Sequence, residues 1–413
     1  MTDSTTKPSR YAKLFIIATV TLDAMGIGLI MPVIPDLIRQ IQHVDLAQAA
    51  FWGGLLSFTY AFMQFVCGPL IGNLSDRFGR RPVLILSLVF MGLDYFLMAI
   101  APTLLLLFIA RTVSGVTGAT YATAAAYLTD ISKKGERSQN FGLLGAAFGI
   151  GFVLGPAIGG LLGELGTRMP FIAAGILALA NALFGYFVLP ETLEANKRRV
   201  FEWRRANPFN ALLRLKNLPA VGALMLVVLI YSTANSVYPS VWSYFTIEQF
   251  GWTVGLVGIS LAIYGVSSAL VQIFALPKLV QRFGERKSAA IGIVIAAASF
   301  GFLAIVENGW LVFMTMPVTA LGGIVGPCLQ GLMADRVADN EQGELQGVFS
   351  SVVAISMIVS PLLMTYVFKR FTETGTSFYL PGAPFAVAGI LAIASLLILW
   401  ATARPRDQAK RTV

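Results

Sequence analysis

Three ionisable residues lie inside long apolar runs of the sequence: Asp23, Asp94 and Arg111. An ionisable side chain at the centre of a membrane costs about 2.5–3.5 kcal/mol on insertion scales, so such residues are functional by default. Apolar surroundings favour the protonated form of a carboxyl group, whereas a nearby arginine favours the ionised form. A carboxylate that faces an arginine can therefore bind and release a proton as its access to water changes.

We predict that Asp23 is the principal proton-coupled carboxylate, with Arg111 as its partner and Asp94 supporting proton or substrate movement. The alternative is a static ion pair that holds helices together, although a buried ion pair is weak support for stability.

The apolar runs that carry these residues have the length and composition of membrane spans. Of the 413 residues, 56% are hydrophobic and only 12% are charged, with a mean hydropathy of +0.74. A soluble domain has about 25% charged residues, whereas a membrane-spanning helix needs about 20 mainly apolar ones. We therefore predict an all-α membrane protein with twelve transmembrane helices. They lie near 13–35, 50–73, 82–101, 104–130, 138–162, 170–189, 219–243, 254–278, 287–306, 309–335, 344–368 and 381–402.

The basic residues are distributed very unevenly between the two sides of these spans. Of the 30 lysines and arginines, 25 fall on the side that also holds both termini, and only Arg39, Arg168, Lys369 and Arg370 fall on the other. Lysine and arginine accumulate on the cytoplasmic side of membrane proteins, so both termini are predicted to be cytoplasmic. The net charge of +9 thus reflects topology, with the lipid bilayer and its anionic headgroups as the partner and no nucleic acid.

The sequence repeats itself at an offset of 205 residues. Matched positions include costly residue types, with Arg77 on Arg282, Gly79 on Gly284, Asp130 on Asp335 and Pro156 on Pro361. Six spans per repeat is an even number, so the repeats are parallel about an axis along the membrane normal. We predict two pseudo-symmetric six-helix bundles, residues 1–190 and 219–413, joined by a basic cytoplasmic linker at 191–218.

The three buried ionisable residues occur in only one of the repeats. At the same offset Asp23, Asp94 and Arg111 are replaced by Val228, Ser299 and Met316. The proton-coupling function is therefore assigned to the first bundle, while rocking of the two bundles about a site at their interface would give alternating access.

A charged loop follows the second predicted span, running from Gly72 to Pro82. Glycine permits a sharp turn there, and an aspartate among arginines can form an ion pair in one conformation only, which makes it a latch. The alternative is a loop that is basic only for topology. Predicted gating residues are Gly72, Asp76, Arg77, Gly79, Arg80, Arg81 and Asp130.

The fifth predicted span carries glycines four residues apart together with a proline. Such spacing makes a flat face on which another helix packs closely, and the proline removes a backbone hydrogen bond and bends the helix. This motif consists of Gly151, Gly155, Pro156, Gly159 and Gly160. A few polar residues among aromatics and methionines suit an amphiphilic ligand, although each can equally form helix–helix hydrogen bonds. Predicted cavity residues are Tyr60, Gln64, Asn235, Gln272 and Gln330.

Three of these motifs resemble signatures of one transporter family. The loop from Gly72 to Pro82 resembles the loop signature of the major facilitator superfamily. The run from Arg111 to Gly118 resembles its intramembrane arginine motif, and the run from Gly151 to Gly160 resembles the motif associated with antiporters. The segments 22–35, 75–82, 93–95 and 115–119 are similar to the tetracycline efflux (TetA-like) branch of that family, as are 250–252, 309–313 and 345–347 in the second half.

This resemblance implies a proton-coupled antiporter of a bacterial cell inner membrane that exports an amphiphilic drug. A tetracycline, free or as its metal chelate, is the first candidate, and the functional unit is a monomer without a cofactor. The family's better-known tetracycline exporters have a histidine and an aspartate where this chain has Ser268 and Ala296. Either proton coupling rests on the first half alone, or the substrate differs from tetracycline. The alternative is export of an endogenous metabolite or lipid-like compound. A sugar-type importer is disfavoured by the antiporter motif.

No enzyme and no metal site is predicted. The single histidine, His43, lies in a polar segment, and Cys67 and Cys328 are not spaced as metal ligands. A catalytic site would need a nucleophile near a base or a set of metal ligands.

Overall fold

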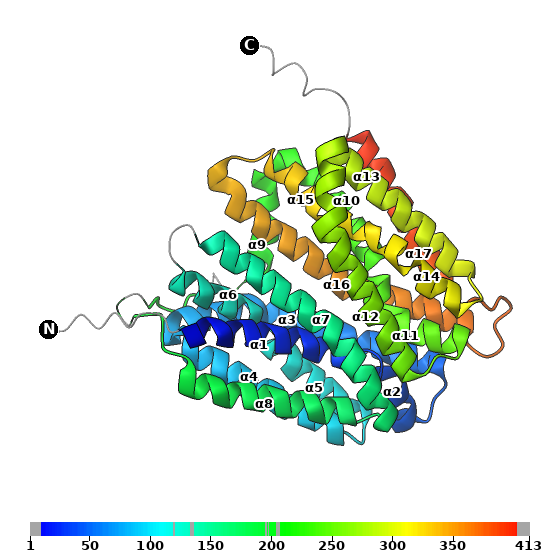
Figure 1. Cartoon of the computed structure of the whole chain (residues 1–413), viewed down its shortest axis with the longest axis horizontal. Coiled ribbons are helices and arrows are strands. Elements are labelled where there is room, and N and C mark those ends of the chain that lie inside the picture. The colour runs from blue at the N-terminus through cyan, green and yellow to red at the C-terminus, as the bar shows by residue number, and fades with distance from the viewer. Residues whose placement is uncertain are drawn as a thin grey trace, which may run out of the picture. The chain divides into compact units, whose positions relative to one another are not determined.

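The computed structural model describes residues 10–118, 120–132, 136–194, 196, 198–203 and 207–402, and every regular element among them is a helix. The predicted all-α fold is confirmed (Figure 1). The α-helices of the first half are α1 (Arg10–Ile30), α2 (Ile34–Gln42), α3 (Leu46–Phe78), α4 (Arg80–Ile100), α5 (Leu104–Thr117), α6 (Thr120–Ile131), α7 (Arg137–Leu165) and α8 (Met169–Val188). Those that follow are α9 (Phe209–Leu213), α10 (Gly222–Asn235), α11 (Val237–Phe250), α12 (Val254–Leu270), α13 (Leu276–Ile305), α14 (Gly309–Thr319), α15 (Val325–Ala334), α16 (Gln342–Thr372) and α17 (Ala383–Ala401).

Eleven helical segments in the described residues are long and apolar enough to cross a membrane. One of them, Val254–Ile305, has 52 residues, which at 1.5 Å per residue would extend about 78 Å. The hydrocarbon core of a bilayer is only about 30 Å thick, so this segment holds two spans. The backbone turns between them at Gly284, where φ is 75°, and the number of spans is therefore twelve, as predicted.

The turns at equivalent places of the two repeats both contain a glycine with positive φ. Gly79, between α3 and α4, has φ 108°, and Gly284, which is 205 residues later, has φ 75°. Both values lie in the region that residues with a Cβ rarely adopt. The repeat read from the sequence thus reappears as a shared backbone conformation.

Several predicted spans are not single α-helices. The span at 309–335 is formed by α14 and α15 with a 3₁₀ turn, η5 (Ala320–Ile324), between them, and a π-helical turn, η4 (Val271–Ala275), follows α12. The span at 104–130 is divided between α5 and α6, next to Ala119, which lies outside the described residues. Such breaks in membrane helices are tolerated only where the backbone is shielded by protein or lines a cavity.

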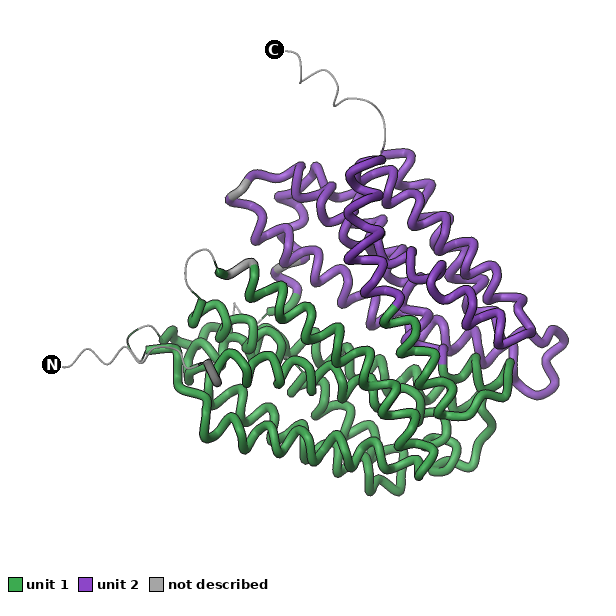
Figure 2. The backbone as a smooth tube through the Cα atoms, viewed as in Figure 1, with its two compact units in different colours: residues 1–208, 243–266 green, residues 209–242, 267–413 purple. Residues whose placement is uncertain are grey.

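The chain forms two compact units, residues 1–208 with 243–266, and residues 209–242 with 267–413 (Figure 2). In unit 1, α1 packs on α7 and α8, α4 packs on α8 and α5, and α3 packs on α5. In unit 2, α13 packs on α17 and α15, and α10 packs on α16 and α17. The unit boundaries differ from the predicted bundles at 1–190 and 219–413, whose six-helix division stays a prediction.

Large apolar side chains remain exposed along many helices, including Leu105, Phe187, Trp310 and Leu397. A soluble monomer rarely carries so much contiguous apolar surface. Lipid is the solvent that such a surface requires.

Candidate functional site

The three ionisable residues that the sequence places inside membrane spans lie near one another in unit 1. Asp23 on α1 is 8% exposed and Asp94 on α4 is 2% exposed. Both carboxylates, and the Arg111 guanidinium on α5, lie within electrostatic range of the hydroxyl groups of Tyr60 and Tyr95. These five residues, called the polar cluster below, come from four helices. Their proximity was predicted for the three charged residues, whereas no feature of the sequence marks Tyr95.

Asp94 is only partly neutralised by its neighbours. Its Oδ2 accepts a hydrogen bond from the Ser114 hydroxyl on α5, and Arg111 lies in electrostatic range. Its Oδ1 is buried and has no hydrogen-bond partner in the described structure. A buried polar atom without a partner is costly, and protonation of such a carboxylate removes part of that cost.

Arg111 contacts the aromatic face of Tyr60, with its Cζ 5.9 Å from the ring centroid. Within the described residues no ion pair of 4.0 Å or less joins Arg111 to a carboxylate. Tyr60 is held by Gln64, whose Nε2 donates to the Tyr60 hydroxyl at 3.4 Å and to the Gly118 carbonyl at 3.0 Å. Two predicted cavity residues, Tyr60 and Gln64, thus belong to the surroundings of Arg111, while the pairing of Arg111 with Asp23 stays a prediction.

The glycines of the fifth span pack α7 directly against the backbone of α1, which carries Asp23. A Cβ added at Gly151 would lie 2.2 Å from the Thr21 carbonyl oxygen, and one at Gly155 would lie 2.5 Å from that of Met25. A Cβ at Gly159 would lie 2.2 Å from the Leu29 carbonyl oxygen. The spacing of four on α7 therefore matches a spacing of four on α1, and Asp23 lies between the first two contacts.

The remaining residues of this motif face two different neighbours. Pro156 packs against Gly28 of α1, where an added Cβ would lie 2.5 Å from the proline Cδ. Gly160 packs against Gly258 in the part of α12 that belongs to unit 1. One turn further, Glu164 accepts a hydrogen bond of 2.8 Å from the backbone N–H of Gly255.

The charged loop between α3 and α4 forms a compact ion-pair network in unit 1. Arg80 Nη1 lies 2.7 Å from Asp76 Oδ1, and Arg80 Nε lies 3.4 Å from Asp130 Oδ2 on α6. The same guanidinium donates to the Ser75 hydroxyl at 3.1 Å. Arg80 therefore joins the ends of α3 and α6, and its gating role stays a prediction.

Glu191, which the sequence reading did not single out, completes this network. Its carboxylate accepts the backbone N–H groups of Arg80 at 2.9 Å and Arg81 at 3.2 Å, and so caps the start of α4. The first N–H groups of a helix lack partners within the helix, and a carboxylate there also suits the helix dipole. The residues are about 110 positions apart, so no local motif signals the contact.

The other predicted residues are less closely connected. Gly72 has no neighbour within 4 Å of an added Cβ, and Arg77 lies over the ring of Phe78 at 5.1 Å. In unit 2, Gln330 donates to Gln346 at 2.5 Å, which is the helix–helix hydrogen bond considered as its alternative. Asn235 is the last residue of α10, and Gln272 lies in the π-helical turn. Arg81 donates to the Tyr186 carbonyl at 2.7 Å.

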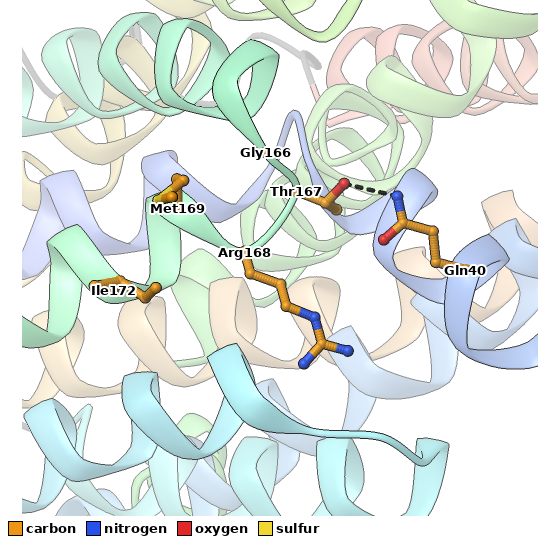
Figure 3. A pocket seen from close by; sticks show the side chains of 6 residues that line it. All are labelled: Gln40, Gly166, Thr167, Arg168, Met169 and Ile172. Carbon is orange, nitrogen blue, oxygen red and sulfur yellow. Dashed lines mark hydrogen bonds between the residues drawn. The ribbon is translucent and has the colours of Figure 1, made fainter.

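A separate cavity of about 340 Å³ lies beside the loop between α7 and α8. Figure 3 shows Gln40 reaching Thr167 there, with Nε2 and Oγ1 2.8 Å apart. Arg168 points away and donates to the Ala99 carbonyl at 2.7 Å and the Ala101 carbonyl at 3.1 Å, which closes the end of α4. None of the predicted site residues lines this cavity, so we assign it a structural role.

The described part of the chain contains no group of three or more His, Cys, Asp and Glu side chains arranged to hold a metal ion. Both cysteines are free and buried.

Twelve apolar spans with repeated glycine turns and a buried charge cluster define a membrane transporter of the two-repeat class. The chain belongs to the Major Facilitator Superfamily, whose family model matches residues 16–239 and 224–412. It is a multi-pass protein of the bacterial inner membrane.

The chain matches its relatives over most of its length and of theirs. The chain is 41% identical over 366 residues to the tetracycline resistance protein, class C, of Escherichia coli, covering 89% of this chain and 92% of that protein. It is 40% identical to the class G protein of Vibrio anguillarum, covering 87% and 91%. Among solved structures, the human organic anion transporter MFSD10 (TETRAN) superposes with a TM-score of 0.70 at 22% identity, covering 95% of this chain and 99% of the other. The last likeness concerns the fold alone.

Proposed function

We propose that this protein exports tetracycline-type amphiphilic drugs in exchange for protons, by alternating access. The observation that carries the substrate assignment is the 41% identity, over 89% of the chain, to a protein named for tetracycline resistance. The polar cluster supports proton coupling, since its two buried carboxylates and one arginine lie together in a single unit. Because the cluster lies within one chain, a monomer suffices for function.

The cluster suggests a division of labour among its residues. Asp23 is the carboxylate that binds the transported proton, because among the described residues no hydrogen-bond donor or ion-pair partner holds it in the ionised form. Asp94 shares its charge with Ser114 and with Arg111, and it receives or passes on the proton as water reaches one side or the other. Tyr60 and Arg111 present an aromatic face and a positive charge, which suit an amphiphilic, anionic or chelated drug.

The packing of α7 on α1 supports coupling between the proton site and helix movement. Gly151 and Gly155 contact the α1 backbone on either side of Asp23. A change in how α7 packs therefore changes the surroundings of the carboxylate, and protonation changes the packing in return.

The test is uptake into inverted membrane vesicles, whose outer face is the cytoplasmic face. With a proton gradient that is acid inside, the wild-type protein should accumulate tetracycline and release protons from the lumen. Asp23→Asn should abolish both while the protein remains in the membrane in normal amount. Asp36→Asn, which changes a surface carboxylate paired with Arg39 on α2, is the matched control and should transport normally.

Three results separate the claims. Undiminished proton-driven uptake by Asp23→Asn would remove Asp23 from the mechanism. Uptake of a lipid-like compound without any tetracycline would favour the alternative substrate class. If the wild-type protein takes up no compound in response to the gradient, antiport itself is refuted.

A further inference from the structure

The segment that follows α8 is hydrogen-bonded to three helices of unit 1, α3, α4 and α6. We call the described residues 190–194, 196 and 198–203 the linker segment. At its start, the Pro190 carbonyl accepts the Tyr127 hydroxyl of α6 at 2.9 Å. Glu191 caps α4, and the Thr192 hydroxyl donates to Asp130 of α6 at 3.2 Å.

The later part of the linker segment is bonded to the last turns of α3. The backbone N–H of Arg199 donates to the Asp76 carbonyl at 3.1 Å. The Asn73 side chain donates from Nδ2 to the Glu202 carbonyl at 2.8 Å. Asn73 and Asp76 are three residues apart and so lie on the same face of the helix. The linker segment therefore runs along the last turns of α3 in the opposite chain direction, with Arg199 at Asp76 and Glu202 at Asn73.

Asn73 is unusual for a residue at this position in a membrane helix. It is 8% exposed, and its Nδ2 reaches a carbonyl 129 residues away in sequence. Asp76 is held from both sides, since its carboxylate pairs with Arg80 at 2.7 Å while its carbonyl accepts the linker segment. Movement at the Asp76–Arg80 pair therefore displaces the linker segment as well.

We infer that the linker segment is a working part of the gate at the predicted cytoplasmic end, and that Asn73 is the positioning residue that holds it on α3. The inference rests on the proposed transport function, which it extends with a specific residue and a specific contact. Asn73 acts through Asp76 and the linker segment and has no contact with the polar cluster. Its removal should therefore alter the rate of the transport cycle and leave substrate binding intact.

Two variants break the two bonds independently. Asn73→Leu removes the side-chain donor at similar volume, and Asn73→Gln retains an amide donor. Arg199→Pro removes the backbone N–H, because proline has none, and it leaves α3 untouched. Arg199→Ala removes the same side chain and retains the N–H, so it is the matched control for the proline.

The first readout is the rate at which chymotrypsin cleaves the linker at Phe201 and Trp203 in inverted vesicles, seen as two half-length fragments. We expect Asn73→Leu and Arg199→Pro to be cleaved at least threefold faster than wild type. Arg199→Ala should be cleaved at the wild-type rate, and Asn73→Gln should lie closer to wild type than Asn73→Leu. The second readout is tetracycline uptake, in which the two disruptive variants should change Vmax at least threefold and KM less than twofold.

The inference is overturned if both disruptive variants are cleaved at the wild-type rate, or if cleavage accelerates while Vmax is unchanged. If Asn73→Leu does not accumulate in the membrane, Arg199→Pro alone tests the inference, because Arg199 lies in a loop. Failure of the proposed function would be seen separately, as a wild-type protein without proton-driven uptake. In that case cleavage of Asp76→Asn still tests the coupling, since loss of the Asp76–Arg80 pair should accelerate it threefold as well.

Discussion

Gly151→Ala gives the sharpest test of the packing between α7 and α1. The added methyl carbon would lie 2.2 Å from the Thr21 carbonyl oxygen, 2.9 Å from the Ala24 Cβ and 3.0 Å from the Met25 nitrogen. Ordinary contacts begin near 3.4 Å, so α1 must retreat by about 1 Å at the level of Asp23. Protein interiors are too densely packed to absorb such a shift freely.

Overpacking of this kind costs about 1–3 kcal/mol, which corresponds to roughly a 5- to 150-fold change in an equilibrium constant. We expect proton-driven uptake by Gly151→Ala to fall by at least fivefold and the purified protein to unfold at a lower temperature. Gly149→Ala, on the same helix, is the control, because an added Cβ there has no neighbour within 4 Å. If Gly151→Ala transports and unfolds like Gly149→Ala, the close helix contact does not position Asp23.

Three further predictions concern the α3–α4 turn and Asp94. Gly79→Ala should reduce the amount of folded protein severalfold, because φ is 108° and the new Cβ would lie 2.3 Å from Glu191 Oε2. Quantitative immunoblotting of the membrane fraction measures this amount. Gly72→Ala is the control and should accumulate normally, because an added Cβ there has open space around it. Glu191→Ala should lower the unfolding temperature by an amount equivalent to about 1 kcal/mol, the usual worth of a helix cap, and an unchanged thermal unfolding curve would contradict the cap. Ser114→Ala should leave both Asp94 oxygens without a hydrogen bond and change the pH dependence of uptake, and an identical pH profile would show that the Ser114 contact has no part in transport.

The fold could be predicted well from the sequence, because the features that indicate it extend over whole membrane spans and occur in both repeats. The apolar runs, the distribution of arginine and lysine and the repeat at 205 residues all depend on many residues at once. The positive φ at Gly79 and Gly284 is the structural form of one such repeated signal. The irregular turns at η4 and η5 were not predicted, since local irregularity is decided by neighbouring helices and not by the span's own composition.

The candidate site was predicted only where rare residue types mark it. Asp23, Asp94 and Arg111 are conspicuous in apolar runs, and the structure brings them into one cluster. Tyr95, Ser114 and Glu191 are ordinary at their positions, and their importance arises from contacts between helices that no spacing rule connects. Gln330 donates a hydrogen bond to Gln346, which is the alternative that the sequence left open for it, and its place in a substrate cavity stays a prediction.

The cap that Glu191 places on α4 has a consequence for the order of folding during synthesis. During synthesis α4 is complete long before Glu191 leaves the ribosome. Until then, the first backbone N–H groups of α4 have water or lipid headgroups as their hydrogen-bond partners. The loop between α3 and α4 reaches its final form only when the end of α8 arrives. The turn between α3 and α4 is thus completed late in synthesis, by a residue that follows the sixth span.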